Sequence, residues 1–134
     1  MYKLALKIAY QAHNGQLRKQ SLVPYIVHPI RVASCFNDDT MKTIAILHDI
    51  VEDTDVTLKN LAKTFPPIII ETIDSLSRRE GEQHFDYIKR CRTNELAKQI
   101  KIIDIVDNLS DTLVICEESM VKRYNKSLSM LINH

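Results

Sequence analysis

The 134 residues include 18 basic and 17 acidic side chains, which give a formal net charge of +1, and 45% of the residues are hydrophobic. A chain of this length builds one domain around a single core, and its balanced charge gives no bulk electrostatic reason for nucleic-acid or membrane binding. Three widely spaced cysteines outside any zinc-finger spacing indicate reduced thiols. We therefore expect one domain over residues 1–134 of a cytoplasmic protein that binds neither nucleic acid nor membranes.

Helical periodicity dominates the sequence, which has two glycines and no hairpin-turn signal. An apolar stripe at Leu4, Ile8 and Ala12 predicts a first helix that ends near Asn14, and residues 16–27 are expected to form a loop.

A second helix is expected from Pro29 to about Phe36, because proline suits the first turn of a helix. The third is expected to begin at a cap, Asp39 or Thr40, and to continue past Val51. Its apolar residues occupy most of its circumference, so we expect this helix to be central and buried.

The remaining predicted helices are separated by short polar connections and by Asn94, a candidate cap. They run from about Leu58 to Phe65 after a Thr57 cap, from Pro66 to Leu76, around Phe85 to Cys91, from Glu95 to about Leu113, and from Met120 through Leu131.

The doublet His48-Asp49 lies in the apolar phrase AILHDIVEDT. Burying an unpaired charge costs several kcal/mol, and a divalent cation is one efficient partner. The alternative is an ordinary solvated doublet. Glu52 and Asp53 follow at helical spacing, which would place four polar groups on neighbouring faces of one apolar helix. Such a concentration of ionisable groups indicates a functional site.

Two further polar residues stand in apolar surroundings, His28 in PYIVHP and Asp104 in KIIDIVDN. Taken alone, His28 fits a hydrogen-bonded core histidine better than a metal ligand. Together with His48 and Asp49, the two complete a set of two imidazoles and two carboxylates on three separate helices. This mixture suits Mn²⁺, Fe²⁺ or Zn²⁺ better than Ca²⁺.

The order H, HD, D resembles the signature of the HD superfamily of metal phosphohydrolases. Four phrases, AHNGQLRK, PYIVHPIRVA, LHDIVEDT and KIIDIVDN, are similar to the hydrolase domain of the RelA/SpoT homologues and especially to Mesh1-like small alarmone hydrolases. The similarity covers about residues 3–113. It implies an all-α, single-domain, compact helical bundle of the HD type.

The resemblance also implies roles for individual residues. The metal, manganese being the usual ion of the family, would be held by four ligands, His28, His48, Asp49 and Asp104. Glu52 and Asp53 match the pair that positions and deprotonates the attacking water. Four residues match or neighbour the nucleotide site: Arg18, Lys19, Tyr25 and Asn108. The implied reaction removes the 3′-pyrophosphate of guanosine tetra- or pentaphosphate and leaves GDP or GTP.

Several alternatives stay open at this point. Arg18 and Lys19 also fit a solvated polar loop, and Tyr25 also fits a packed, partly buried tyrosine. Leu22-Val23 replaces the family's Gly-Glu, and Ser110 replaces an arginine, so another nucleotide or an adenosine alarmone is the second hypothesis. A non-catalytic binding module is the third, and homodimer formation is left undecided by the sequence.

Overall fold

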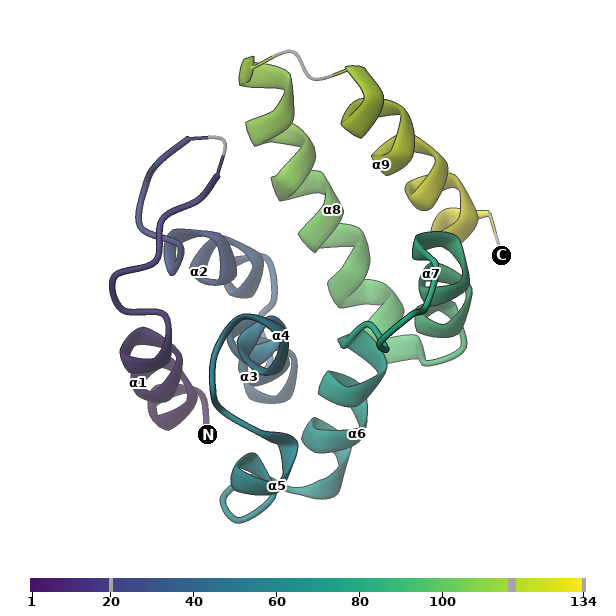
Figure 1. The fold of residues 1–134 in the computed structure, drawn as a ribbon. Coiled ribbons are helices and arrows are strands. Elements are labelled where there is room, and N and C mark those ends of the chain that lie inside the picture. The colour runs from purple at the N-terminus through teal and green to yellow at the C-terminus, as the bar shows by residue number, and fades with distance from the viewer. Residues whose placement is uncertain (20, 116–117, 134) are drawn as a thin grey trace.

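The computed structural model describes residues 1–19, 21–115 and 118–133, whose regular structure is helical apart from one isolated bridge between Leu17 and Pro24. The expected all-α class is thereby confirmed. Figure 1 shows α8 as the longest helix, with α9 packed beside it. The helices in this part of the chain are α1 (Tyr2–Ala12), α2 (Val27–Ser34), α3 (Asp39–Leu47), α4 (Ile50–Asp53), α5 (Leu58–Leu61), α6 (Pro67–Leu76), α7 (His84–Arg92), α8 (Glu95–Ile115) and α9 (Glu118–Ile132). None of these helices is long and apolar enough to cross a membrane.

The helix starts follow ordinary capping chemistry. The Thr57 side chain accepts a hydrogen bond from the backbone N–H of Asn60, and Asn94 accepts one from Ala97, as expected for N-caps. The expected cap of α3 was wrong by one residue, because Asp38 accepts from the N–H of Met41 while Asp39 is already helical.

The second helix begins at Val27, two residues before the expected start at Pro29. The N–H of Val27 donates to Pro24 O at 3.1 Å and that of His28 donates to Tyr25 O at 3.0 Å, so the chain is already turning before Pro29. This early start places His28 in the first turn of α2, with its side chain facing the interior at 1% exposure.

The central helix α3 is the best-buried element, as its sequence predicted. Ile44 through Leu47 are fully buried, and α3 packs against α1, α2, α6 and α8. A second, smaller apolar cluster joins α7, α8 and α9, with Tyr87, Ile88 and Leu131 among its members. Because α8 contacts both groups, it connects the central helices to the C-terminal hairpin.

The expectation of one continuous helix from Asp39 past Val51 was wrong. Helix α3 ends at Leu47, and the single turn α4 starts at Ile50. In a continuous helix the Ala45 carbonyl would accept from the N–H of Asp49; here it accepts from both the backbone N–H and the Nδ1 of His48, the latter at 2.6 Å. A side chain that competes for a helix carbonyl favours such a break. The break places His48 and Asp49 at a junction between two helices.

Candidate metal centre and active site

Four predicted ligands converge on one point, although their elements are far apart in sequence. The ligand atoms of His28, His48, Asp49 and Asp104 all lie within 4.8 Å of one another. They come from α2, the α3–α4 junction and α8. Asp104 Oδ1 lies 2.7 Å from His28 Nε2 and 3.1 Å from His48 Nε2, and Asp49 Oδ2 lies 3.0 Å from His48 Nε2. The structure therefore brings together the set that the sequence singled out, and their role as ligands stays a prediction.

The outer nitrogens of both histidines already have partners. His48 Nδ1 lies 2.6 Å from the carbonyl oxygen of Ala45, and His28 Nδ1 lies 2.6 Å from Asp107 Oδ2. A carbonyl can only accept a hydrogen bond, so Nδ1 of His48 carries hydrogen and donates. Each imidazole then presents Nε2 to the cluster, and this is the arrangement in which a histidine ligates a metal.

The two central carboxylates differ in their partners. Burial alone would raise the pKa of Asp104, but Lys101, whose Nζ lies 2.8 Å from Oδ2, together with His48 outweighs burial and holds this pKa well below its usual range. Asp49 accepts a hydrogen bond from the Tyr25 hydroxyl, and the nearby histidines lower its pKa to about 2 against the effect of burial. Both aspartates are therefore ionised at neutral pH and offer carboxylate oxygens as metal ligands.

The donor set fits a divalent transition metal. Two imidazole nitrogens and two ionised carboxylate oxygens face one another, and the second nitrogen of each imidazole is held by another group. Burial would lower the pKa of His28 and of His48, but the neighbouring aspartates reverse this and raise both values. A proton and a divalent cation compete for the same Nε2 lone pairs.

Glu52 and Asp53 lie on α4, directly after the proposed ligands. The spacing expected from one unbroken helix was wrong, since the junction at residues 48–49 separates His48 from the helical turn that carries Glu52. The N–H of Asp53 still donates to Asp49 O at 3.0 Å. The carboxylate of Glu52 accepts a hydrogen bond from the backbone N–H of Arg78.

The electrostatic surroundings of this pair suit a proton acceptor. Desolvation by the surrounding protein raises the pKa of Glu52 and of Asp53, and the charge of Asp49 raises both further. A raised carboxyl pKa makes the carboxylate a stronger base, as general base catalysis requires. Both side chains also keep access to solvent.

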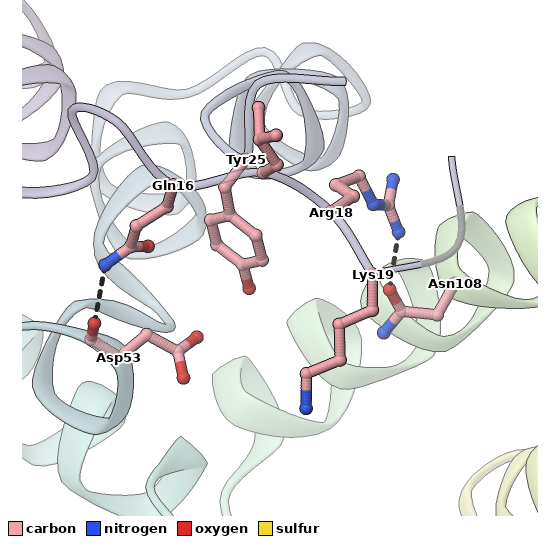
Figure 2. Close-up of a pocket in the computed structure, with 7 residues that line it drawn as sticks. Gln16, Arg18, Lys19, Tyr25, Asp53 and Asn108 are labelled. Atoms are coloured by element: carbon pink, nitrogen blue, oxygen red, sulfur yellow. Dashed lines mark hydrogen bonds between the residues drawn. The ribbon is translucent and has the colours of Figure 1, made fainter. Parts of the chain in front are cut away.

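A pocket of about 460 Å³ opens beside the candidate metal centre. Figure 2 shows Asp53 and Tyr25 on one side of it and Asn108 on the other, with the Lys19 side chain extending between them. Gln16 closes one end by donating to the backbone oxygen of Asp53 at 2.7 Å. The four residues expected at the nucleotide site therefore all line one cavity: Arg18, Lys19, Tyr25 and Asn108.

Arg18 occupies a different environment from a solvated loop residue. Arg18 is 4% exposed, and its guanidinium lies 2.8 Å from Asp107 Oδ2 and 2.9 Å from Asp111 Oδ2. It also donates to the side-chain oxygen of Asn108 at 2.8 Å. The alternative of a solvated polar loop was wrong for Arg18, because acceptors from α8, some 90 positions later in the chain, enclose its charge.

Tyr25 combines the two roles considered for it. Its ring packs against His13 and His28, with centroid separations of 4.9 and 5.9 Å, so it is a packed, partly buried tyrosine. Its hydroxyl donates to Asp49, and its ring borders the pocket. Burial and Asp49 raise the pKa of Tyr25, which keeps the hydroxyl protonated as a donor.

Sequence reasoning assigned no role to Asp107, Lys101 or Arg31. Asp107 follows Asp104 by three positions and Lys101 precedes it by three, so helical spacing alone places both beside this ligand on α8. Arg31, whose Nε lies 2.8 Å from Asp107 Oδ1, carries no such signal, since its partner lies on another helix.

The fold agrees with comparisons to known proteins. The model of a family described as HD domain matches residues 5–107. The chain belongs to the HD-domain family. Among similar proteins of this family, the MESH1 guanosine-3′,5′-bis(diphosphate) 3′-pyrophosphohydrolase of Drosophila melanogaster is 33% identical over 121 residues, which cover 81% of the chain and 68% of that enzyme.

Longer relatives match this chain over a small part of their own length. The guanosine-3′,5′-bis(diphosphate) 3′-pyrophosphohydrolase of Borreliella burgdorferi is 44% identical over 78 residues, which cover 55% of the chain and 12% of that protein. The bifunctional (p)ppGpp synthase/hydrolase SpoT of Escherichia coli is 33% identical over 79 residues, which cover 55% of the chain and 11% of SpoT. The matched part of the chain therefore corresponds to about a tenth of the length of these larger proteins.

A solved structure, reported as a metazoan ortholog of SpoT that hydrolyzes ppGpp and plays a role in starvation responses, has the same fold. It superposes with a TM-score of 0.81 at 24% identity and covers 98% of this chain and 83% of that one. Almost the whole chain thus follows the HD architecture.

Proposed function

We propose that this protein is a metal-dependent pyrophosphohydrolase that removes the 3′-pyrophosphate of guanosine tetra- or pentaphosphate. The observation that carries the proposal is the convergence of His28, His48, Asp49 and Asp104 beside a pocket of about 460 Å³. The similarity to the MESH1 enzyme, which extends over two thirds of that enzyme's length, supports the choice of substrate.

The metal centre supplies the first part of the mechanism. The two histidines and two aspartates would hold Mn²⁺, or Fe²⁺ or Zn²⁺, which suit the same nitrogen and oxygen donors. When bound, such an ion lowers the pKa of a coordinated water and neutralises charge on phosphoryl oxygens. The Tyr25 hydroxyl and the Lys101 ammonium orient the carboxylates of Asp49 and Asp104 for this purpose.

Two carboxylates of the protein, Asp53 and Glu52, act on the attacking water. Asp53 borders the pocket and is assigned as the base that takes a proton from the attacking water. Glu52, fixed by the Arg78 backbone N–H, is assigned to orient that water. The water oxygen bonds to the phosphorus attached to the 3′-oxygen, the bond from phosphorus to that oxygen breaks, and the 3′-oxygen takes up a proton. The products are pyrophosphate and GDP or GTP.

The pocket residues bind the nucleotide in this proposal. Lys19 extends into the cavity and offers a cation to phosphate, Asn108 offers an amide, and the ring of Tyr25 forms part of the wall. Arg18 is assigned a supporting role, because its guanidinium is enclosed by Asp107 and Asp111.

The test is turnover by the purified protein loaded with Mn²⁺. Release of pyrophosphate from guanosine tetraphosphate is expected, and the variant Asp49→Ala should lose bound metal and activity together. If guanosine tetraphosphate stayed intact while an adenosine alarmone was cleaved, the substrate would be the adenosine alarmone. The replacements at Leu22-Val23 and Ser110 favour this second hypothesis. A protein that turns over no nucleotide, and whose affinity for a partner is unchanged by Asp49→Ala, would be a binding module.

Cytoplasmic localisation and homodimer formation are independent of this chemistry. Cell fractionation tests the first, and sedimentation of the purified protein tests the second.

A further inference from the structure

Asp107 connects one of the proposed metal ligands to a buried charge network. It lies on α8, one helical turn after Asp104, and its side chain is 14% exposed. Its Oδ2 atom lies 2.6 Å from Nδ1 of His28. The contact joins residues 79 positions apart in sequence and is among the shortest polar contacts of the centre.

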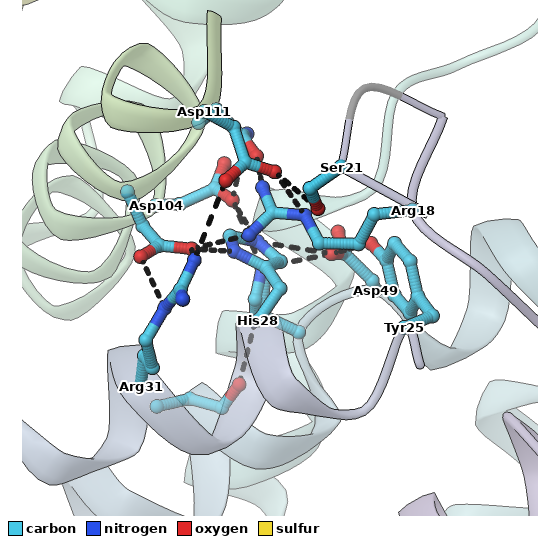
Figure 3. Close-up of polar contacts among 12 residues, drawn as sticks. Arg18, Ser21, Tyr25, His28, Arg31, Asp49, Asp104 and Asp111 are labelled. Atoms are coloured by element: carbon cyan, nitrogen blue, oxygen red, sulfur yellow. Dashed lines mark hydrogen bonds and ion pairs between the residues drawn. The ribbon is translucent and has the colours of Figure 1, made fainter. Parts of the chain in front are cut away.

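The carboxylate of Asp107 is itself held in place by two arginines. Arg31 donates from Nε to Oδ1 at 2.8 Å, and Arg18 donates from a terminal nitrogen to Oδ2 at 2.8 Å. Figure 3 shows both guanidinium groups converging beside His28. Two guanidinium groups at hydrogen-bonding distance stabilise the charged form of this carboxylate. The group is therefore a fixed, ionised acceptor.

A fixed acceptor at Nδ1 determines what Nε2 of the same imidazole can do. Because an ionised carboxylate cannot donate, the shared hydrogen belongs to Nδ1 of His28. The ring is then oriented with Nε2 toward Asp104, at 2.7 Å, and toward Asp49, at 3.6 Å. A carboxylate partner also makes an imidazole more basic and hence a better metal ligand.

His48 provides an internal comparison. Its Nδ1 is held by a backbone carbonyl, that of Ala45, which no side-chain substitution removes. His28 is thus the histidine of the pair whose orientation depends on another side chain.

We propose that Asp107 is a positioning residue of the metal centre, which orients His28 for ligation and is itself anchored by Arg18 and Arg31. This inference rests on the proposed metal site and extends it to residues for which sequence reasoning gave no role. It also assigns Arg18 an action through Asp107, in place of direct contact with phosphate.

The experiment compares Mn²⁺ affinity in Asp107→Ala and Asp111→Ala, measured by electron paramagnetic resonance of the free ion during titration. Removing a carboxylate that supports a metal-ligating histidine typically costs 10–100-fold in affinity, and this loss is expected for Asp107→Ala. Asp111 is the matched control, because it contacts Arg18, Arg31 and Ser21 but none of the four ligands. Asp111→Ala should keep the wild-type affinity.

A third variant separates orientation of the ring from loss of fold. Asp107→Asn preserves size and an acceptor oxygen, so its affinity should lie between those of the wild type and Asp107→Ala, with a wild-type helical circular dichroism spectrum. The inference would be overturned if the wild type, Asp107→Asn and Asp107→Ala all bound Mn²⁺ with equal affinity. It would also be overturned if Asp107→Ala and Asp111→Ala lost Mn²⁺ affinity to the same extent. The titration contains no nucleotide, so failure of the proposed substrate leaves this result intact.

Discussion

Leu22 has a left-handed backbone conformation, which glycine adopts more readily than any other residue. Its φ is +58°, in the left-handed region that L-residues occupy at a cost, and the resemblance described above implies glycine at this position. Its side chain is 69% exposed, so it gains little from packing. Leu22→Gly is therefore expected to raise the free energy of unfolding by about 0.5–1 kcal/mol, since strain of about 1–2 kcal/mol exceeds the entropy that glycine adds to the unfolded chain.

Urea denaturation measures this change, and the neighbouring residue supplies the control. Val23 does not share the left-handed conformation, and its carbonyl accepts from the N–H of Arg18 at 2.8 Å. Val23→Gly should therefore lower the free energy of unfolding by roughly the usual glycine cost of 0.5–1 kcal/mol. A loss of stability in both variants would show that the loop carries no strain at Leu22.

At the residue scale, the sequence predicted the cluster of candidate ligands better than its surroundings. His28 and Asp104 stood out because polar groups in apolar phrases need partners, and the structure places them 2.7 Å apart. The burial of Arg18 could not be predicted, because its acceptors Asp107 and Asp111 lie about 90 positions away. The local sequence pattern indicates that a buried polar side chain requires a hydrogen-bond or ion-pair partner. Which residue provides that partner is determined by the tertiary fold.

At the scale of elements, the helix boundaries that follow capping rules were predictable, and the interruption between α3 and α4 was not. Thr57 and Asn94 cap their helices through contacts three residues away. The interruption depends on the orientation of one imidazole, His48, toward the Ala45 carbonyl. Apolar periodicity through residues 44–51 gives no indication of that orientation.

Helices α7 and α9 are in contact at His84, and the protonation of this residue makes the free energy of unfolding depend on pH. His84 Nε2 lies 2.9 Å from Ser127 Oγ, and that hydroxyl donates to the backbone oxygen of Arg123. Neutral His84 therefore donates from Nε2. Burial, reinforced by the charges of Arg123, Lys101 and Arg78, lowers the pKa of His84 to about 4.

The sign of the effect follows from linkage. Between pH 6.5, the ordinary histidine value, and about 4, the unfolded chain binds a proton at His84 that the folded chain does not. The contribution of His84 to the free energy of unfolding is thus present above pH 6.5 and is lost as the pH falls toward 4. His84→Gln should flatten this part of the curve of unfolding free energy against pH. An unchanged slope in the variant would contradict the lowered pKa.

At the scale of the whole molecule, the proposed metal centre joins elements from both halves of the chain. Its proposed ligands lie on α2, at the α3–α4 junction and on α8, and α8 also packs against α9. Ordering these elements around one ion couples metal binding to folding, because the unfolded chain holds no such preformed set. Binding that favours the folded state stabilises it by about 2.7 kcal/mol at a free ion concentration one hundred times the dissociation constant.

Mn²⁺ at that concentration should therefore raise the midpoint of thermal unfolding by several degrees, and a chelator should reverse the increase. Asp49→Ala removes a ligand at the α3–α4 junction, so its midpoint should be independent of Mn²⁺. The control Asp74→Ala alters a carboxylate on α6 whose ion pair is with Arg79 at 2.9 Å, and it should keep the wild-type response. Equal shifts in Asp49→Ala and Asp74→Ala would locate the stabilising ion elsewhere on the surface. A shift confined to proteins with all four ligands intact would show that one ion holds α2, the α3–α4 junction and α8 together.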